Sequence, residues 1–183
     1  MRSELAGGVF HVTMRGNARA VIFHEPHDYD VFLGMVAKTV ARFEWLLHSF
    51  VLLPNHFHLL LETPQPNLGR GMLVLNGSYA RRYNAKFDRV GHVFQTPYRS
   101  KPVRSDAHFV EAIRYIANNP VQAQLCARAE DWPWSSFRAT IGLSSVPRFL
   151  QTGRVLAQFD SVAELRAFAA AKAMSSNHVA GHG

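Results

Sequence analysis

Two histidines one residue apart, inside an apolar run, are the first candidates for chemistry in this chain. The run is VLLPNHFHLLLE, residues 51–62, and it contains His56 and His58. Alternate side chains of a β-strand share a face, so the two imidazoles would point one way and Phe57 the other. Neutral imidazole is a common metal ligand, and the pair could bind one cation. A half-exposed polar strand face is the alternative, and a short motif alone leaves both readings open.

A tyrosine and an asparagine form a second candidate pair in EAIRYIANNP, residues 111–120. Apolar residues at helical spacing predict a helix with one buried face, and they are Phe109, Ile113 and Ile116. Tyr115 lies off that face, four residues before Asn119 and on the same side as Asn119. The phenol could be a nucleophile, and the Asn119 amide oxygen could complete a cation site with the two histidines. In the other interpretation Tyr115 is an interfacial tyrosine and Asn119 a helix C-cap.

The positive charge of the chain indicates an anionic partner. The sequence has 183 residues and a formal net charge of +7, with 48% hydrophobic content, which suits one hydrophobic core. Nucleic acid is the first candidate, and a merely soluble basic protein is the alternative. The basic residues singled out as DNA-binding are Arg81, Arg82, Lys86, Arg99, Lys101, Arg104 and Arg114, and Arg15 and Asn17 in the Arg-Gly-Asn turn could hold a phosphate.

The single cysteine and the absence of long apolar runs predict a cytoplasmic protein with no membrane role. Cys126 alone cannot form an intramolecular disulfide or a thiolate zinc cluster. The N-terminus lacks the apolar core of a signal peptide, and no run approaches the length of a bilayer span.

The elements that must position these residues follow the order βαββαβ, with a further helix after them. Strands are predicted at residues 9–13, 45–53, 56–63 and 98–103, and helices at 29–43, 68–86 and 106–119. This order predicts an α+β fold with a ferredoxin-like antiparallel sheet, helices on one face and a C-terminal helical extension. We expect one domain at 1–141 and an extension at 142–183, with a helix at about 161–174 and a disordered tail.

Six sequence blocks, in order, resemble the IS200-like, REP-associated tyrosine transposases, also called the Y1 transposase family. The resemblance covers roughly residues 8 to 140. The blocks are HVTMRGN (11–17), LLPNHFHLLLE (52–62), SYARRYN (78–84), GHVFQ (91–95), YIANNPVQA (115–123) and DWPWSS (131–136). Each block is weak alone, whereas six in register make a chance match improbable.

The resemblance implies an HUH single-strand DNA endonuclease and strand transferase. His56 and His58 would bind Mg²⁺ or Mn²⁺ with Asn119 as a further ligand, and Tyr115 would attack the scissile phosphate to leave a 5′-phosphotyrosine link. The partner would be single-stranded DNA beside hairpins formed by REP-like repeats, and the protein a monomer or homodimer. Where the family often has a Gly-Arg pair after the GHxFQ block, this chain has Thr96-Pro97, and the proline removes a backbone donor there, which bears on DNA contacts or strand geometry at this edge.

Two other functions remain open on the sequence. One is a catalytically inactive, repressor-like DNA-binding relative, and the other is a small metallohydrolase in which Tyr115 only positions substrate. Among the remaining titratable side chains, Tyr79 and Tyr83 lie on the apolar stripe of the 68–86 helix, so we expect core roles for them. Nothing in the spacing of His11 and His92 requires them at the site, and we expect them to be structural.

Overall fold

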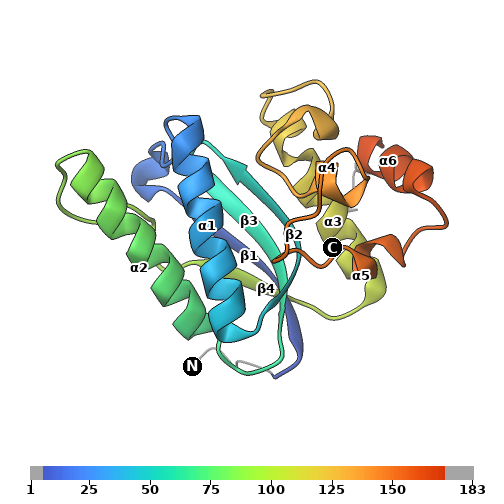
Figure 1. Ribbon diagram of the computed structural model, residues 1–183, viewed down its shortest axis with the longest axis horizontal. Coiled ribbons are helices and arrows are strands. Elements are labelled where there is room, and N and C mark those ends of the chain that lie inside the picture. Colours follow the sequence, from blue (N-terminus) through green and yellow to red (C-terminus); the bar gives the residue numbers. More distant parts are fainter. Residues whose placement is uncertain (1–5, 172–183) are drawn as a thin grey trace, which may run out of the picture.

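Four antiparallel strands form the centre of the molecule in the computed structural model, which describes residues 6–171 (Figure 1). Their order across the sheet is β2-β3-β1-β4, so β1 lies between β3 and the edge strand β4. A turn at Pro54-Asn55 joins the adjacent strands β2 and β3. The strands are β1 Gly8–Arg15, β2 Leu46–Leu53, β3 His56–Thr63 and β4 Arg99–Val103.

One face of the sheet is covered by α1, Pro26–Phe43, and α2, Leu68–Lys86 (Figure 1). Strand alternation sends Phe57, Leu59 and Leu61 of β3 to this face, where they join a large apolar core. Tyr79 and Tyr83 of α2 are buried in the same core, as expected. The strand order, the antiparallel pairing and the placement of α1 and α2 confirm the predicted ferredoxin-like plan.

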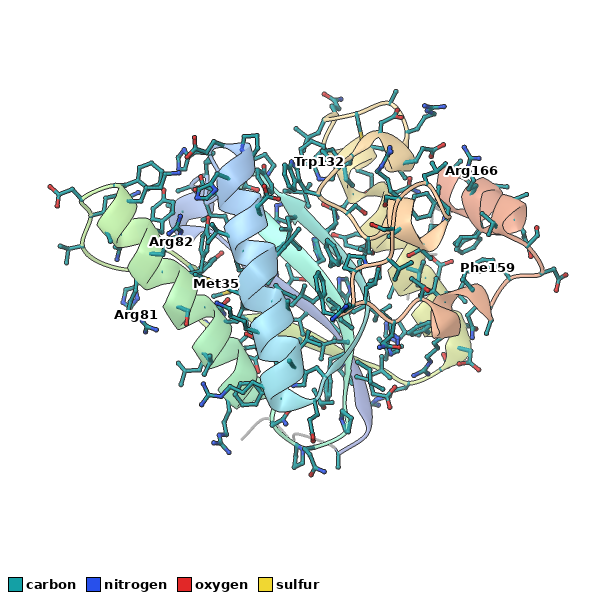
Figure 2. All side chains as sticks on the ribbon, viewed as in Figure 1. Met35, Arg81, Arg82, Trp132, Phe159 and Arg166 are labelled. Atoms are coloured by element: carbon teal, nitrogen blue, oxygen red, sulfur yellow. The ribbon has the colours of Figure 1, made fainter. Side chains whose placement is uncertain are left out.

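The opposite face of the sheet carries α3, Asp106–Gln122, and the chain that follows it. A second core forms here from Leu60 of β3, Phe109 and Ile116 of α3, and Leu165 of the last helix. Figure 2 shows Phe159 and Arg166 on this side of the molecule. The later helices are α4 Phe137–Thr140, α5 Gly153–Leu156 and α6 Val162–Ala170, and the 3-10 turns are η1 Asn17–Arg19 and η2 Ala129–Asp131.

The C-terminal end of α3 differs from the sequence expectation. At the other end the N-cap is Ser105, which accepts a hydrogen bond from the His108 N–H. The helix continues through Pro120 to Gln122 instead of ending at Asn119. A proline so close to the end of a helix removes one backbone bond, and burial of Asn119 and Pro120 offsets that loss. The preference of the residue before proline for extended backbone is therefore overridden by packing.

The C-terminal helix is shorter than predicted within the described residues. Its Ser161 N-cap accepts from the Glu164 N–H, as the sequence predicts, and α6 ends at Ala170. Residues 172–174 of the predicted helix, and the predicted disordered tail, lie outside the described residues. The proposed division at residue 141 stays a prediction. No helix within residues 6–171 combines the length and apolar character that crossing a bilayer requires.

Candidate functional site

His56 and His58 point from β3 towards α3, away from the core that Phe57 enters. The strand register sets His58 opposite Thr13 and His56 opposite Arg15 on β1. The two rings are nearly perpendicular, with centroids 5.2 Å apart. The sequence expectation that both imidazoles share one face is therefore confirmed.

Two side chains of β1 hold the imidazole of His58. The His58 Nδ1 atom lies 3.0 Å from the His11 Nε2 atom and 3.0 Å from the Thr13 hydroxyl oxygen. His58 Nε2 is buried and has no hydrogen-bond partner among the described residues. If Nδ1 carries the proton and donates to these two acceptors, Nε2 presents a bare lone pair to the interior of the site. A buried, unpaired imidazole nitrogen in this tautomer is what a metal ligand requires.

His56 contacts the amide of Asn119 across the gap between β3 and α3. Its Nε2 atom lies 3.1 Å from Asn119 Oδ1, and its Nδ1 atom lies 2.7 Å from Asn55 Oδ1. A neutral imidazole has one N–H and can donate to only one of these oxygens. Adjacent ligands of an octahedral cation with bonds of about 2.1 Å lie roughly 3.0 Å apart, so the His56–Asn119 spacing also suits a shared cation. Asn119 is not the helix C-cap, which is Ala123.

Tyr115 stands at the open side of this group. The side chain is 44% exposed, so its phenol is accessible from solvent. Its ring makes edge contacts with His58 and His11 at centroid distances of 5.3 and 5.6 Å. The structure therefore brings Tyr115, His56, His58 and Asn119 together from β3 and α3.

Burial keeps the three imidazoles neutral. Desolvation is the main cause that lowers the pKa of His56 and takes the pKa of His58 well below its usual range. The same cause lowers the pKa of His11 to about 4, with a further contribution from Lys101. Neutral rings keep a lone pair for a cation at pH 7. Within residues 6–171 no group of three His, Cys, Asp or Glu side chains is arranged to hold one metal ion, and the oxygen that lies next to His56 Nε2 belongs to the Asn119 amide.

The expected DNA-binding residues divide into two groups by position. Arg99 and Lys101 of β4 pair opposite Thr13 and His11, so they lie along the rim of the site, as does Arg15 at the end of β1. Arg114 is next to Tyr115 on α3 and pairs with Glu111, Arg104 follows β4, and Asn17 begins the turn after β1.

The other group lies on α2, which covers the opposite face of the sheet. Arg81 and Arg82 are visible on that helix in Figure 2. Arg82 contacts the His27 imidazole, and Lys86 pairs with Glu25 and Asp28. These three side chains do not line the candidate site.

Sequence reasoning missed His11 and Thr13, which were not assigned to the site. Both lie on the same face of β1 as Arg15, in the alternating pattern His-x-Thr-x-Arg of residues 11–15. That alternation of polar side chains in an otherwise apolar strand was the available signal. His92, by contrast, is exposed and takes no part in the site.

Comparisons with known proteins give one family and one fold. The family model described as "Transposase IS200 like" matches residues 6–119, which is more than half of the chain. A Haemophilus influenzae protein, provisionally named a REP-associated tyrosine transposase, is 24% identical over 132 residues that cover 66% of this chain and 75% of the relative. A solved structure of a REP-associated tyrosine transposase bound to a REP hairpin superposes with a TM-score of 0.67 at 18% identity, covering 82% of this chain and 89% of that one.

Proposed function

The chain belongs to the IS200-like transposase family, and from this premise we propose that it cuts and rejoins single-stranded DNA with Tyr115 as nucleophile. The observation that carries the proposal is the convergence of an accessible phenol, two neutral imidazoles and a buried amide oxygen in one cluster. An inactive DNA-binding relative would not need a bare, buried imidazole nitrogen at His58.

In the proposed reaction the Tyr115 oxygen attacks the scissile phosphorus. The bond from phosphorus to the 3′ oxygen breaks, the phenolic proton is transferred to that oxygen, and the products are a 5′-phosphotyrosine and a free 3′-hydroxyl. A 3′-hydroxyl of another strand can reverse the exchange, because one phosphodiester is traded for another. Strand transfer therefore needs no external energy source.

The cation expected in this family is Mg²⁺ or Mn²⁺, and the residues present fit it. His56 Nε2, His58 Nε2 and Asn119 Oδ1 would hold it, and when bound it would supply Lewis-acid polarisation of the scissile phosphoryl oxygen. His11 and Thr13 fix the His58 ring so that Nε2 faces the site. A donor set of two imidazoles and one amide also suits other divalent metals, so the choice of Mg²⁺ or Mn²⁺ rests on the family.

The proposed substrate is single-stranded DNA next to a hairpin of the REP type. The solved relative is bound to such a hairpin. In this chain the formal charge of +7, and the row of Arg15, Arg99 and Lys101 beside the site, support a phosphate-rich partner.

A denaturing gel tests the proposal. Purified protein is incubated with 3′-labelled single-stranded hairpin oligonucleotides from its own locus, with Mn²⁺ or with EDTA. We expect label that migrates with the wild-type protein only in Mn²⁺, and none with Tyr115→Phe. Tyr29→Phe is the matched control, since Tyr29 is buried on the far side of the sheet against Trp134, and it should keep the adduct. Binding without any adduct would favour the inactive relative, and metal-dependent cleavage that survives Tyr115→Phe would favour a metallohydrolase.

A further inference from the structure

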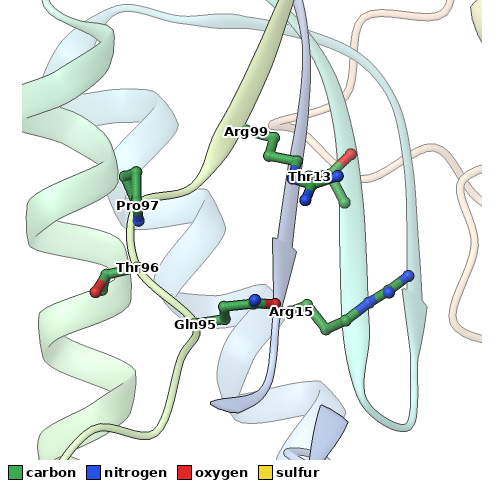
Figure 3. Close-up of a pocket in the computed structure, with 6 residues that line it drawn as sticks. All are labelled: Thr13, Arg15, Gln95, Thr96, Pro97 and Arg99. Atoms are coloured by element: carbon green, nitrogen blue, oxygen red, sulfur yellow. The ribbon is translucent and has the colours of Figure 1, made fainter. Parts of the chain in front are cut away.

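A polar cavity opens between the end of β1 and the segment that leads into β4 (Figure 3). Its volume of about 430 Å³ lies within the range of about 300–1,000 Å³ that is usual for small-ligand sites. The side chains that line it include two guanidinium groups, one amide and two hydroxyls. The lining residues are Thr13, Arg15, Gln95, Thr96, Pro97 and Arg99.

The cavity exists because the two chain segments differ in length between the same two pairing points. Thr13 of β1 pairs with Arg99, and the carbonyl of Arg15 accepts a hydrogen bond from the Gln95 N–H at 2.8 Å. One residue separates these points on β1, whereas the three residues 96–98 separate them on the other segment. The extra residues must leave the ladder, and Pro97 has no N–H to donate to it.

The charges that face this cavity are uncompensated. Neither guanidinium, of Arg15 or of Arg99, has a hydrogen-bond or ion-pair partner in the described part of the chain. By contrast, the ammonium group of Lys86 pairs with Asp28, and the guanidinium group of Arg154 pairs with Glu62. Two unpaired guanidinium groups at one polar cavity favour an anionic ligand, and phosphate matches their geometry.

The cavity borders the candidate active site. Thr13 lines the cavity and its hydroxyl also contacts the His58 imidazole, while Arg15 lies opposite His56 across the β1–β3 ladder. A strand whose phosphate meets Tyr115 would therefore pass the mouth of the cavity within a short distance of the cleaved bond.

We propose that this cavity binds one nucleotide of the DNA strand next to the phosphate that Tyr115 attacks. Its phosphate contacts Arg15 and Arg99, and the edge of its base is read by the side-chain amide of Gln95, which makes no hydrogen bond within the described residues. The inference rests on the proposed function, because the cavity has this role only if DNA lies at Tyr115. It adds a site of base selection that depends on a residue outside the catalytic cluster.

The test measures base preference without cleavage. Full-length Tyr115→Phe protein is mixed with a randomised single-stranded DNA pool in EDTA, and the bound molecules are sequenced. We expect a preferred base at one position of the bound strand, and a loss of about tenfold in that preference when Gln95→Leu is added. Preferences at other positions should stay. Arg42→Ala is the matched control, since Arg42 is an exposed residue near the end of α1 on the opposite side of the sheet.

The phosphate contacts are tested by the salt dependence of binding to the same pool. For single strands the slope of log affinity against log salt falls by about 0.7 for each phosphate contact removed. Arg15→Ala and Arg99→Ala should each lower the slope by about that amount, and Arg42→Ala should leave it unchanged. Circular dichroism confirms that every variant is folded.

Two results would overturn the inference: an unchanged base preference in Gln95→Leu, or salt slopes of Arg15→Ala and Arg99→Ala equal to that of Arg42→Ala. The proposed function is decided separately, by the covalent adduct of the wild type in Mn²⁺. Because the binding assay uses no metal and no cleavage, a missing adduct would refute the transesterase and leave the result on the cavity valid.

Discussion

Removal of both acceptors of the His58 Nδ1 proton should cost much more than the sum of the two single changes. His11→Phe keeps an aromatic ring beside Tyr115 but removes the ring nitrogen, and Thr13→Val keeps the branched shape in the strand but removes the hydroxyl. His11 Nε2 and the Thr13 oxygen lie at the same distance, 3.0 Å, from His58 Nδ1. In the tautomer with the proton on Nδ1, one N–H is shared by two acceptors, and either alone can satisfy it.

The magnitude follows from this sharing. Each single variant keeps one hydrogen bond to Nδ1. Its free energy of unfolding should fall by about 0.5 kcal/mol, which is the lower end of the usual net contribution of one hydrogen bond. The double variant leaves a buried donor without a partner, on a residue only 3% exposed, and should lose about 2–3 kcal/mol. The interaction energy of the cycle is then roughly 1–2 kcal/mol. Mn²⁺ affinity should fall about 10- to 100-fold in the double variant, since the His58 ring loses its fixed tautomer and orientation.

Two measurements check this prediction on the wild type, the two single variants and the double variant. Urea unfolding in EDTA, at a pH above the ordinary pKa of histidine, gives the stability cycle without metal. Free Mn²⁺ measured by electron paramagnetic resonance gives the affinity cycle without DNA or turnover. Strictly additive single effects in both cycles would refute the reasoning, because they would mean that the two acceptors do not serve the same proton.

Three further predictions concern packing, protonation and the cation ligands. A Cβ at Gly71 would lie 2.0 Å from the Trp45 ring, so Gly71→Ala should destabilise the protein by about 1–3 kcal/mol. A Cβ at Gly34 would have no atom within 4 Å, so Gly34→Ala should stabilise the protein by about 0.5–1 kcal/mol. Urea unfolding of both variants measures the two effects. Burial lowers the pKa of His11 from 6.5 to about 4, so as the pH falls the unfolded chain takes up this proton before the folded chain does. The contribution of His11 to the free energy of unfolding is therefore complete above pH 6.5 and is lost as the pH falls towards 4. The free energy of unfolding of metal-free His11→Phe should decline less steeply over that window than that of the wild type. Asn119→Leu should weaken Mn²⁺ binding at least about tenfold and abolish the DNA adduct, while binding to the hairpin in EDTA persists. An adduct at the wild-type level would show that Asn119 is not a cation ligand.

The fold was predictable from the sequence because its signals are local and periodic. The alternation in β3 assigns Phe57 to one face and His58 to the other, and helical spacing in α2 places Tyr79 in the core. Each of these patterns is complete within one element. The order of elements then restricts the antiparallel sheet to few topologies.

The missed features depend on contacts between distant segments. His11 reaches His58 only because β1 and β3 pair in one register, and the two residues are 47 positions apart in the chain. Spacing within β1 carries no information about that partner. The end of α3 was misplaced for a related reason, since a local rule for Pro120 competes with burial that only the folded chain provides. The cavity at Pro97 arises from unequal segment lengths between two pairing points, which also becomes visible only when both strands are in place.

The two-residue turn between β2 and β3 sets the register of β3 and therefore the face on which its imidazoles lie. Backbone carbonyls of Pro54 and Asn55 accept hydrogen bonds from Gly16, Ile22 and Phe23, which fix where the second strand begins. A slip of one residue would turn every side chain of β3 to the other face, with both imidazoles in the apolar core and a phenyl ring at the candidate site. Relatives that keep the imidazoles on the face that packs against α3 should therefore conserve the length of this turn even where its residues differ. A library of single-residue insertions should find this turn the least tolerant of the surface turns.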